Sequence, residues 1–428
     1  MDSTVASIVI DWGYTRLKFW ATDRCGRLVD QCAYYTKELI ENPVYYDDHS
    51  LDSIKVLILR YLQRCNLSGK TSLYLSSQMH CLAGRLESGE LFISTWNDLP
   101  LLLVSDEDVQ ISNGIPLLHS MPINKIRHVQ GGVRAESDWL SRTHGSSQIP
   151  IASASSPLTL ILSDLFASPL PCSLAWWQSS CLPYQLLGGP PLCSTFISES
   201  PCRLSSETSS SLVGDISEFL VFPEIGDLQA STFLALKNYD LLINLGTGSQ
   251  LIFCSLQVGT PWSYTRIWPG MSEPIVTLSH LPCGRLLSAY AEKRGMSISS
   301  LAQCLDRLQS DRIEEIALKH LTSLLFFPGF CFLEGKYLNR PPVSLDQIAL
   351  LEPSVMLSLW VYQYVFLLQL ALQSSTTSIT PVSIGVCGNL GGMAPSFVGH
   401  LRAIFSPPAL IGMDVSSIYT NQLAAFSS

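Results

Sequence analysis

The pattern of apolar and polar residues predicts alternating strands and helices along the N-terminal half. Residues 7–28 predict a hairpin, because the apolar runs SIVI and LKFWAT flank the polar turn DWGYTR. A helix is predicted over residues 50–67, where apolar positions recur on one face. Two further strands, 71–76 and 91–95, end in the clusters QMH and WND. Ligands of open α/β sheets bind at the carboxyl ends of strands, so both clusters are candidates for a binding site.

The stretch 225–251 holds the strongest local signal for chemistry. A lone carboxylate, Asp227, follows Gly226, where a missing side chain lets the backbone approach a ligand. A helix over 230–236 and a buried strand over 241–245 are predicted next. That strand leads into the turn Gly246-Thr247-Gly248-Ser249, whose amides and hydroxyls suit a phosphate oxygen. The pattern indicates either a base beside a nucleotide or an ordinary helix–turn–strand unit.

The C-terminal half is predicted to be mainly helical. Helices are expected over 283–294 and 300–321, and a strand over 382–386 leads into the glycine-rich turn CGNLGG at 387–392. The run VMLSLWVYQYVFLLQLAL at 355–372 carries no charge and approaches the length of a membrane span. Because Gln363 and Gln369 interrupt it and no basic flank adjoins it, we expect a buried helix instead.

Composition narrows the class of protein. A chain of 428 residues can form two or three domains, and 47% hydrophobic with only 14% charged residues excludes general disorder. A net charge of −9 argues against a nucleic-acid partner but not against a nucleotide.

The cysteines favour a reducing compartment. There are thirteen, with no CxxC motif and no Cys/His pair at zinc spacing. The start MDSTVASIVIDWG lacks the basic and apolar regions of a signal peptide. We therefore expect free thiols and a cytoplasmic protein. Two disulfides in the Ser/Pro/Cys-rich segment 169–211 are the alternative, and they would require export.

A series of short motifs, in order along most of the chain, resembles the FGGY carbohydrate kinases of the actin-like ATPase superfamily. IDWGYTRLK is similar to the first phosphate hairpin of that family, SSQMHCLAG and TWND to its sugar-side elements, and SMPINKIRHV to its Ser-x-Pro-x-x-Lys signature. GDLQAS resembles the catalytic-aspartate turn, LINLGTGSQL the second phosphate turn and VCGNLGG the adenosine loop. Within the family, GDLQAS and GTGSQ are most similar to the sedoheptulokinase branch.

The resemblance implies an α/β protein of two actin-like (ribonuclease H-like) lobes, with mixed sheets flanked by helices and an interlobe cleft. Residues 1–238 would form the sugar-binding lobe and 239–428 the nucleotide-binding lobe. The implied activity is transfer of the ATP γ-phosphate to a hydroxyl of a ketose, with sedoheptulose expected, in the presence of Mg²⁺. Sugar and ATP are then the partners, with no nucleic acid and no membrane; a homodimer is left open.

The resemblance also implies roles for individual residues. Asp227 would accept the proton of the sugar hydroxyl, and Asp11 would hold the metal, largely through water. The residues implied to contact the nucleotide are Asp11, Gly13, Thr15, Gly246, Thr247, Gly248, Ser249, Gly388 and Asn389. Those implied to line the sugar pocket are Gln78, Met79, His80, Trp96, Asp98 and Asp227.

Several positions depart from the family pattern. Tyr14 and Arg16 replace small hydroxyl residues of the first hairpin, and Leu99-Pro100 stand where an arginine is expected. Such losses leave a second class open, a catalytically impaired protein that binds nucleotide or sugar without turnover. A third alternative, a 2-keto-3-deoxy-sugar-acid kinase, is suggested by the DWG start, but it would not be expected to carry QMH and WND together.

Overall fold

The computed structural model describes most of the chain. The described residues are 4–40, 45–79, 81–86, 89–94, 151–173, 176, 200–205, 218–254, 264–266, 268, 275–321, 332–333, 336–337, 345–374, 383–388 and 390–405. They form two compact units that divide between Ala230 and Ser231, inside helix α10 (Asp227–Leu236). The predicted boundary, between residues 238 and 239, lies just after the same helix. The sugar-binding and nucleotide-binding assignments of the two lobes stay predictions.

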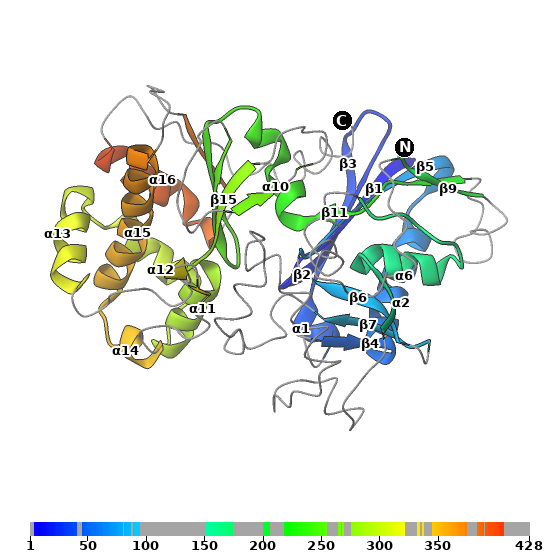
Figure 1. The fold of residues 1–428 in the computed structure, drawn as a ribbon, viewed down its shortest axis with the longest axis horizontal. Coiled ribbons are helices and arrows are strands. Elements are labelled where there is room, and N and C mark those ends of the chain that lie inside the picture. Colours follow the sequence, from blue (N-terminus) through cyan, green and yellow to red (C-terminus); the bar gives the residue numbers. More distant parts are fainter. Residues whose placement is uncertain are drawn as a thin grey trace. The chain divides into compact units, whose positions relative to one another are not determined.

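A mixed sheet in the order β3-β2-β1-β5-β10-β9 forms the centre of the first unit (Figure 1). Strand β1 pairs antiparallel with β2 and parallel with β5, and the short β11 adds parallel to β5. The predicted hairpin at 7–28 is thereby confirmed. The strands of this sheet are β1 (Val5–Trp12), β2 (Arg16–Thr22), β3 (Leu28–Tyr35), β5 (Leu67–Ser77), β9 (Cys202–Ser205), β10 (Glu218–Val221) and β11 (Ile225–Gly226).

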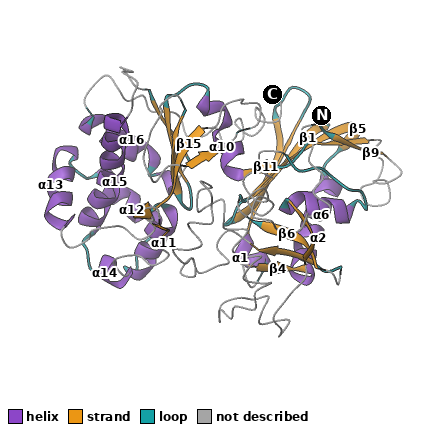
Figure 2. Ribbon diagram, viewed as in Figure 1, coloured by secondary structure: helices purple, strands orange, loops and turns teal. Residues whose placement is uncertain are grey.

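A smaller sheet, in the order β4-β7-β6-β8, and three helices complete the described part of this unit (Figure 2). The predicted helix at 50–67 is observed as α2, whose Ile54 and Ile58 are fully buried. Asp47 caps it by accepting from Ser50 N at 2.8 Å. The elements are β4 (Tyr45–Asp47), β6 (Leu82–Leu86), β7 (Leu91–Ser94), β8 (Ile151–Ser155), α1 (Thr36–Leu39), α2 (Asp48–Arg64) and α6 (Pro157–Leu165).

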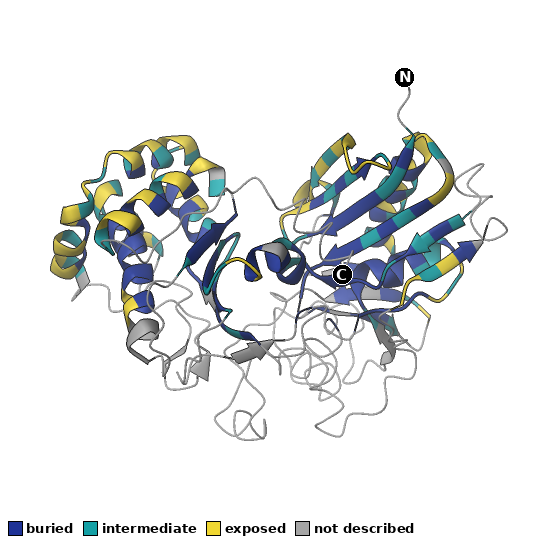
Figure 3. Cartoon of the chain, turned by 90° about the horizontal axis from the view of Figure 1, so that it is seen from above, coloured by how far each residue is buried: buried dark blue, intermediate teal, exposed yellow. Residues whose placement is uncertain are grey.

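The second unit is built on a five-stranded sheet in the order β14-β15-β13-β12-β18. One face carries the apolar core beneath the helices, and Figure 3 shows buried residues in the strands and on the inward helix faces. The strands are β12 (Leu241–Leu245), β13 (Ser249–Phe253), β14 (Tyr264–Arg266), β15 (Ile275–Leu281) and β18 (Ile384–Cys387), with the separate pair β16 (Phe332–Leu333) and β17 (Lys336–Tyr337). The helices are α11 (Gly284–Lys293), α12 (Ile298–Asp306), α13 (Ser310–Leu321), α14 (Leu345–Ala349), α15 (Pro353–Ser374), α16 (Ala394–Ile404) and the 3-10 turn η3 (Leu390–Gly392).

Helix α15 contains the uncharged run that the sequence predicts to be a buried helix, and this prediction is confirmed. Its Trp360 and Tyr364 are fully buried, and both donate to the carbonyl of Pro282, at 3.0 and 3.2 Å. Among the described helices, none is long and apolar enough to cross a membrane.

Two predicted helices have different bounds. The single helix expected over 300–321 is two helices, α12 and α13, separated at residues 307–309. Leu305 of α12 and Ile313 of α13 both lie in the core. Helix α10 begins at Asp227 rather than at residue 230, so the candidate base lies in its first turn.

Candidate active site

Asp11 lies at the carboxyl end of β1 and is only 3% exposed. It is the direct cross-strand partner of Lys18 on β2 and of Ser76 on β5. Lys18 Nζ lies 2.7 Å from Asp11 Oδ2, and Ser76 Oγ donates to Oδ1 at 2.5 Å. Both oxygens of this buried carboxylate therefore have a donor within the same sheet.

Asp227 is brought beside Asp11 by the order of three neighbouring strands. Asp11 pairs with Ser76, and Ser76 pairs with Ile225 of β11, which leads directly into Asp227. The neighbouring Leu228 N donates to Asp227 Oδ1 at 2.9 Å. Residues 65 positions and more apart in the chain thus converge, as the carboxyl ends of parallel strands do.

The motif GDLQ has a local physical reason. Gly226 N donates to Gln229 Oε1 at 2.8 Å, so the glutamine caps the start of α10. A Cβ at Gly226 would lie 2.3 Å from Met79 Cγ, a distance that real contacts essentially never show. Glycine at this position lets the turn before Asp227 pack directly against Met79.

Electrostatics set the protonation of Asp227. Burial, and then the negative charge of Asp11, raise its pKa to about 6. The Leu228 amide, the Lys18 ammonium and the Met79 amide oppose this rise. The pKa of Lys18 is itself raised, chiefly by Asp11, so the ammonium stays charged beside the two acids. A carboxylate that titrates near neutral pH is suited to accept and release a proton.

The first hairpin turn contains the predicted contacts Gly13 and Thr15. Gly13 N donates to Arg16 O at 3.0 Å, and Thr15 O accepts from Thr36 N at the same distance. Arg16, which replaces a small hydroxyl residue of the family pattern, donates to Tyr35 Oη at 2.5 Å and lies 4.4 Å from the centre of that ring. The Tyr14 phenol contributes to a raised pKa of Tyr46, so it lies near that ring.

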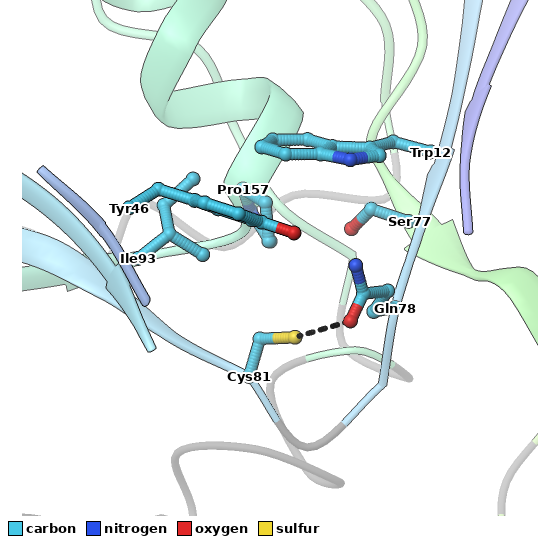
Figure 4. Close-up of a pocket in the computed structure, with 7 residues that line it drawn as sticks. All are labelled: Trp12, Tyr46, Ser77, Gln78, Cys81, Ile93 and Pro157. Carbon is cyan, nitrogen blue, oxygen red and sulfur yellow. Dashed lines mark hydrogen bonds between the residues drawn. The ribbon is translucent and has the colours of Figure 1, made fainter. Parts of the chain in front are cut away.

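Gln78 and Met79 of the predicted sugar pocket follow β5. Gln78 lines a narrow crevice with Trp12, Tyr46, Ser77, Cys81, Ile93 and Pro157 (Figure 4). The rings of Trp12 and Tyr46 stack with centroids 5.3 Å apart, and the Cys81 thiol donates to Gln78 Oε1 at 3.8 Å. The predicted contacts His80, Trp96 and Asp98 lie outside the described residues.

The second candidate phosphate turn belongs to the second unit. Gly246 N donates to Gly248 O at 3.1 Å, which closes the turn. The start of α11 is tied to it, because Gly284 N donates to Gly246 O at 3.0 Å and Arg285 N to Thr247 O at 2.8 Å. Gly246, Thr247 and Gly248 are partly exposed, whereas Ser249 is fully buried as the first residue of β13.

Gly388 lies next to this turn because β18 and β12 are parallel neighbours. Its φ is +99°, and a Cβ would lie 1.9 Å from the Leu245 carbonyl oxygen, so only glycine fits. The two glycine-rich turns of this unit are thereby brought together. Asn389 lies outside the described residues.

The donor set of the first unit suits a metal ion held mainly by phosphate and water. No group of three His, Cys, Asp or Glu side chains is placed to bind a metal among the described residues. Asp11 already accepts from Lys18 and Ser76, and each carboxylate oxygen has a further lone pair for a water ligand. Mg²⁺ commonly keeps several waters and binds through one or two carboxylates plus substrate phosphates, so Asp11 fits such an ion.

Sequence reasoning assigned no role to two charged residues of this region. Lys18 follows the turn of the hairpin on the second strand, directly opposite Asp11, and it is the last residue of the motif IDWGYTRLK, which was the signal available for it. Glu224 precedes β11 and is fully buried. Nothing in its local sequence marks it, because its partners come from other segments.

The sequence matches no protein-family model, and no curated protein matches it either. The fold, however, is similar to solved structures. They include ligand-bound xylulose kinase from Lactobacillus acidophilus, at 14% identity and TM-score 0.61 over 98% of this chain and 89% of that chain. Xylulose kinase from Rhodospirillum rubrum matches at 13% identity and TM-score 0.63, over 98% of this chain and 90% of that chain. Plasmodium falciparum glycerol kinase with ADP matches at 13% identity and TM-score 0.57, over 98% of this chain and 88% of that chain.

The chain therefore has the two-domain α/β fold of the actin-like sugar kinases, with mixed sheets flanked by helices. The predicted α/β class, with two lobes of mixed sheets flanked by helices, is confirmed. At this level of identity the likeness concerns the fold alone, so activity and substrate follow as a proposal.

Proposed function

We propose that this protein is an ATP-dependent carbohydrate kinase that phosphorylates a hydroxyl of a ketose, with sedoheptulose as the first candidate. The observation that carries the proposal is the Asp227 carboxyl, with a pKa of about 6, beside the Asp11–Lys18 ion pair. A sugar hydroxyl is a poor nucleophile and needs a base of this kind.

The proposed reaction uses Asp227 as the general base. The substrate hydroxyl gives its proton to the Asp227 carboxylate as its oxygen forms a bond to the γ-phosphorus of ATP. The bond between that phosphorus and the bridging oxygen breaks, and its electron pair leaves with ADP. Asp227 then returns the proton to solvent. Lys18 keeps a positive charge beside the two acids throughout.

The nucleotide is proposed to bind at backbone turns. Gly13 and Thr15 in the first unit, and Gly246 to Ser249 with Gly388 in the second, are the proposed contacts. Mg²⁺, when bound, would neutralise phosphate charge, and Asp11 would hold it through water. Phosphoryl transfer depends mostly on such positioning and charge neutralisation, so amide-rich turns suit it.

The choice of sedoheptulose as the first candidate substrate rests on the motifs GDLQAS and GTGSQ alone. The structural neighbours include proteins named for xylulose, gluconate and glycerol. All four compounds belong in the panel that tests the proposal.

The test is a coupled assay of ADP release over ketoses, aldoses, polyols and sugar acids, run with and without Mg²⁺. We expect Mg²⁺-dependent turnover with a ketose, and a loss of at least about a hundredfold in Asp227→Ala, the usual contribution of a positioned base. Glu315→Gln, which alters an exposed ion pair on α13, serves as the control. Retained ATP binding without turnover on any compound would overturn the kinase and leave the binding protein considered above.

A further inference from the structure

Glu224 is a carboxylate placed where carboxylates are rarely found. It is 0% exposed and lies directly before β11, whose two residues lead into Asp227. A buried acid needs hydrogen-bond donors to remain inside a protein. Its partners therefore show what it holds together.

Glu224 has a partner on each of three other segments. Ser77 Oγ, at the end of β5, donates to its Oε1, and Thr159 N, in the first turn of α6, donates to Oε2 at 2.5 Å. The Glu224 backbone carbonyl accepts from Ser173 N at 3.2 Å. Burial raises the pKa of this carboxyl, and the hydrogen bonds from Ser77 and Thr159 oppose the rise. One side chain thus joins β5, α6 and the residues that precede Asp227.

Strand β11 alone provides little to hold its place. Its ladder with β5 consists of Ile225–Ser76 and Gly226–Ser77. On the far side, Gln229 is bonded to Gly226 N at 2.8 Å. Asp227 therefore lies between two side-chain anchors, Glu224 before it and Gln229 after it. Small displacements at a reacting group can cost about a hundredfold in rate, so such anchoring matters for a base.

We propose that Glu224 is a positioning residue, whose hydrogen bonds to Ser77 and Thr159 hold the partly buried Asp227 carboxyl in its place beside Asp11. The expected effect on kcat rests on the proposed function. The expected effect on the surroundings of Asp227 does not depend on turnover.

Glu224→Gln tests it, because the amide keeps the size of the side chain but has one accepting oxygen, so it cannot accept from both Ser77 Oγ and Thr159 N. We expect kcat to fall about tenfold to a hundredfold while the KM for ATP changes less than about threefold. Loosening the turn exposes the partly buried Asp227 carboxyl to more water, so the acid limb of kcat/KM should move to lower pH than in the wild type. Ser77→Ala removes one anchor with less disturbance, and should shift both quantities in the same direction by less.

Glu218→Gln is the matched control. Glu218 lies on β10 of the same sheet and pairs with Arg203 at 3.2 Å, away from β11. Its loss should leave the kcat and the acid limb unchanged. A Glu224→Gln protein that unfolds more easily but keeps both the wild-type kcat and the wild-type acid limb would show a merely structural role and overturn the proposal.

A second measurement separates this inference from the proposed function. The pH above which the stability difference between wild type and Asp227→Asn stops growing reports the pKa of Asp227 in the folded state, without any turnover. The same comparison is then made with and without Asp227→Asn in a protein that carries Glu224→Gln, or Ser77→Ala if Glu224→Gln does not fold. We expect that pH to be lower in this background. No movement would overturn the inference even if the wild type is an active kinase. A clear shift of this pH in a protein that shows no turnover would support the inference and overturn the proposed kinase activity.

Discussion

Lys18 Nζ and Asp11 Oδ2 lie 2.7 Å apart across the β1–β2 ladder, in which the two residues are direct partners. The contact does more than satisfy a buried acid. Lys18 also lowers the pKa of Asp227, whereas Asp11 raises it. One ammonium thus balances two carboxylates, and the protonation of the candidate base depends on both neighbours.

Opposite changes at this pair should shift the acid limb of kcat/KM in opposite directions. Lys18→Met removes a positive charge that favours the Asp227 carboxylate, so the limb moves to higher pH. Asp11→Asn removes a negative charge, so the limb moves to lower pH in whatever activity remains. Lys37→Met, an exposed lysine beside Tyr35, is the control and leaves the limb in place. Shifts of the same sign in both variants would contradict this electrostatic account.

Wild-type kcat/KM should rise with pH through about 6, because Asp227 must be deprotonated to act as a base. Measurement of kcat/KM with saturating Mg²⁺ from pH 4.5, about 1.5 units below the limb, to pH 8.5, about 2.5 units above it, checks this. A profile that stays flat down to pH 4.5 would contradict the assignment of Asp227.

Asp227→Asn should stabilise the fold while abolishing turnover. The folded pKa, about 6, lies above the ordinary value of 3.8 for an aspartate, so the folded state holds the proton more tightly between these two pH values. Wild-type stability therefore falls as pH rises from about 4 to 6, and the variant avoids this loss. Two pKa units correspond to about 3 kcal/mol, the upper limit of the gain at pH 7 in urea unfolding. Equal stability at pH 7 would contradict the raised pKa.

Gly388→Ala should be far more damaging than Gly392→Ala. Both glycines have positive φ, +99° and +91°, so both substitutions strain the backbone by about 1–2 kcal/mol. Only at Gly388 does the added Cβ meet a backbone atom, the Leu245 oxygen at 1.9 Å, whereas nothing lies within 4 Å at Gly392. We expect Gly388→Ala to cost about 3 kcal/mol or more in urea unfolding. Similar costs for the two variants would show that the turn shifts to make room.

Asp164→Asn should destabilise the first unit. Asp164 on α6 pairs with Arg85 at 2.6 Å and with Lys55 at 2.8 Å, which lowers the pKa of its carboxyl against the opposing effect of burial. Stabilisation from a lowered pKa is present above the unfolded value, about 4, and is lost as pH falls through the folded one. The expected cost is about 1 kcal/mol at pH 7, shrinking toward pH 3. Glu315→Gln, half exposed, should show no comparable change.

The hairpin, α2 and the buried α15 were predictable because each is encoded by local periodicity. The apolar runs on either side of the polar turn predict the two strands, and Ile8, Val9 and Ile10 of the first are all buried. Helix α15 has apolar residues on all sides, and a helix of this kind is stable in water only when the protein buries it. The break between α12 and α13 was missed, because no glycine or proline marks it. Leu305 and Ile313 would share one face of a continuous helix as well, so the apolar pattern does not indicate a break.

By itself, the sequence determined which residue types are available: an acid after Gly226, glycine-rich turns after strands, and an ordered series of motifs that resembles sugar kinases. Only the tertiary structure decided that Asp11 and Lys18 pair, that Asp11 raises the pKa of Asp227, and that Glu224 joins β5 to α6. The reason is physical. Periodicity reports the burial of neighbouring residues, whereas a carboxyl pKa depends on charges and donors that arrive through strand order from distant parts of the chain.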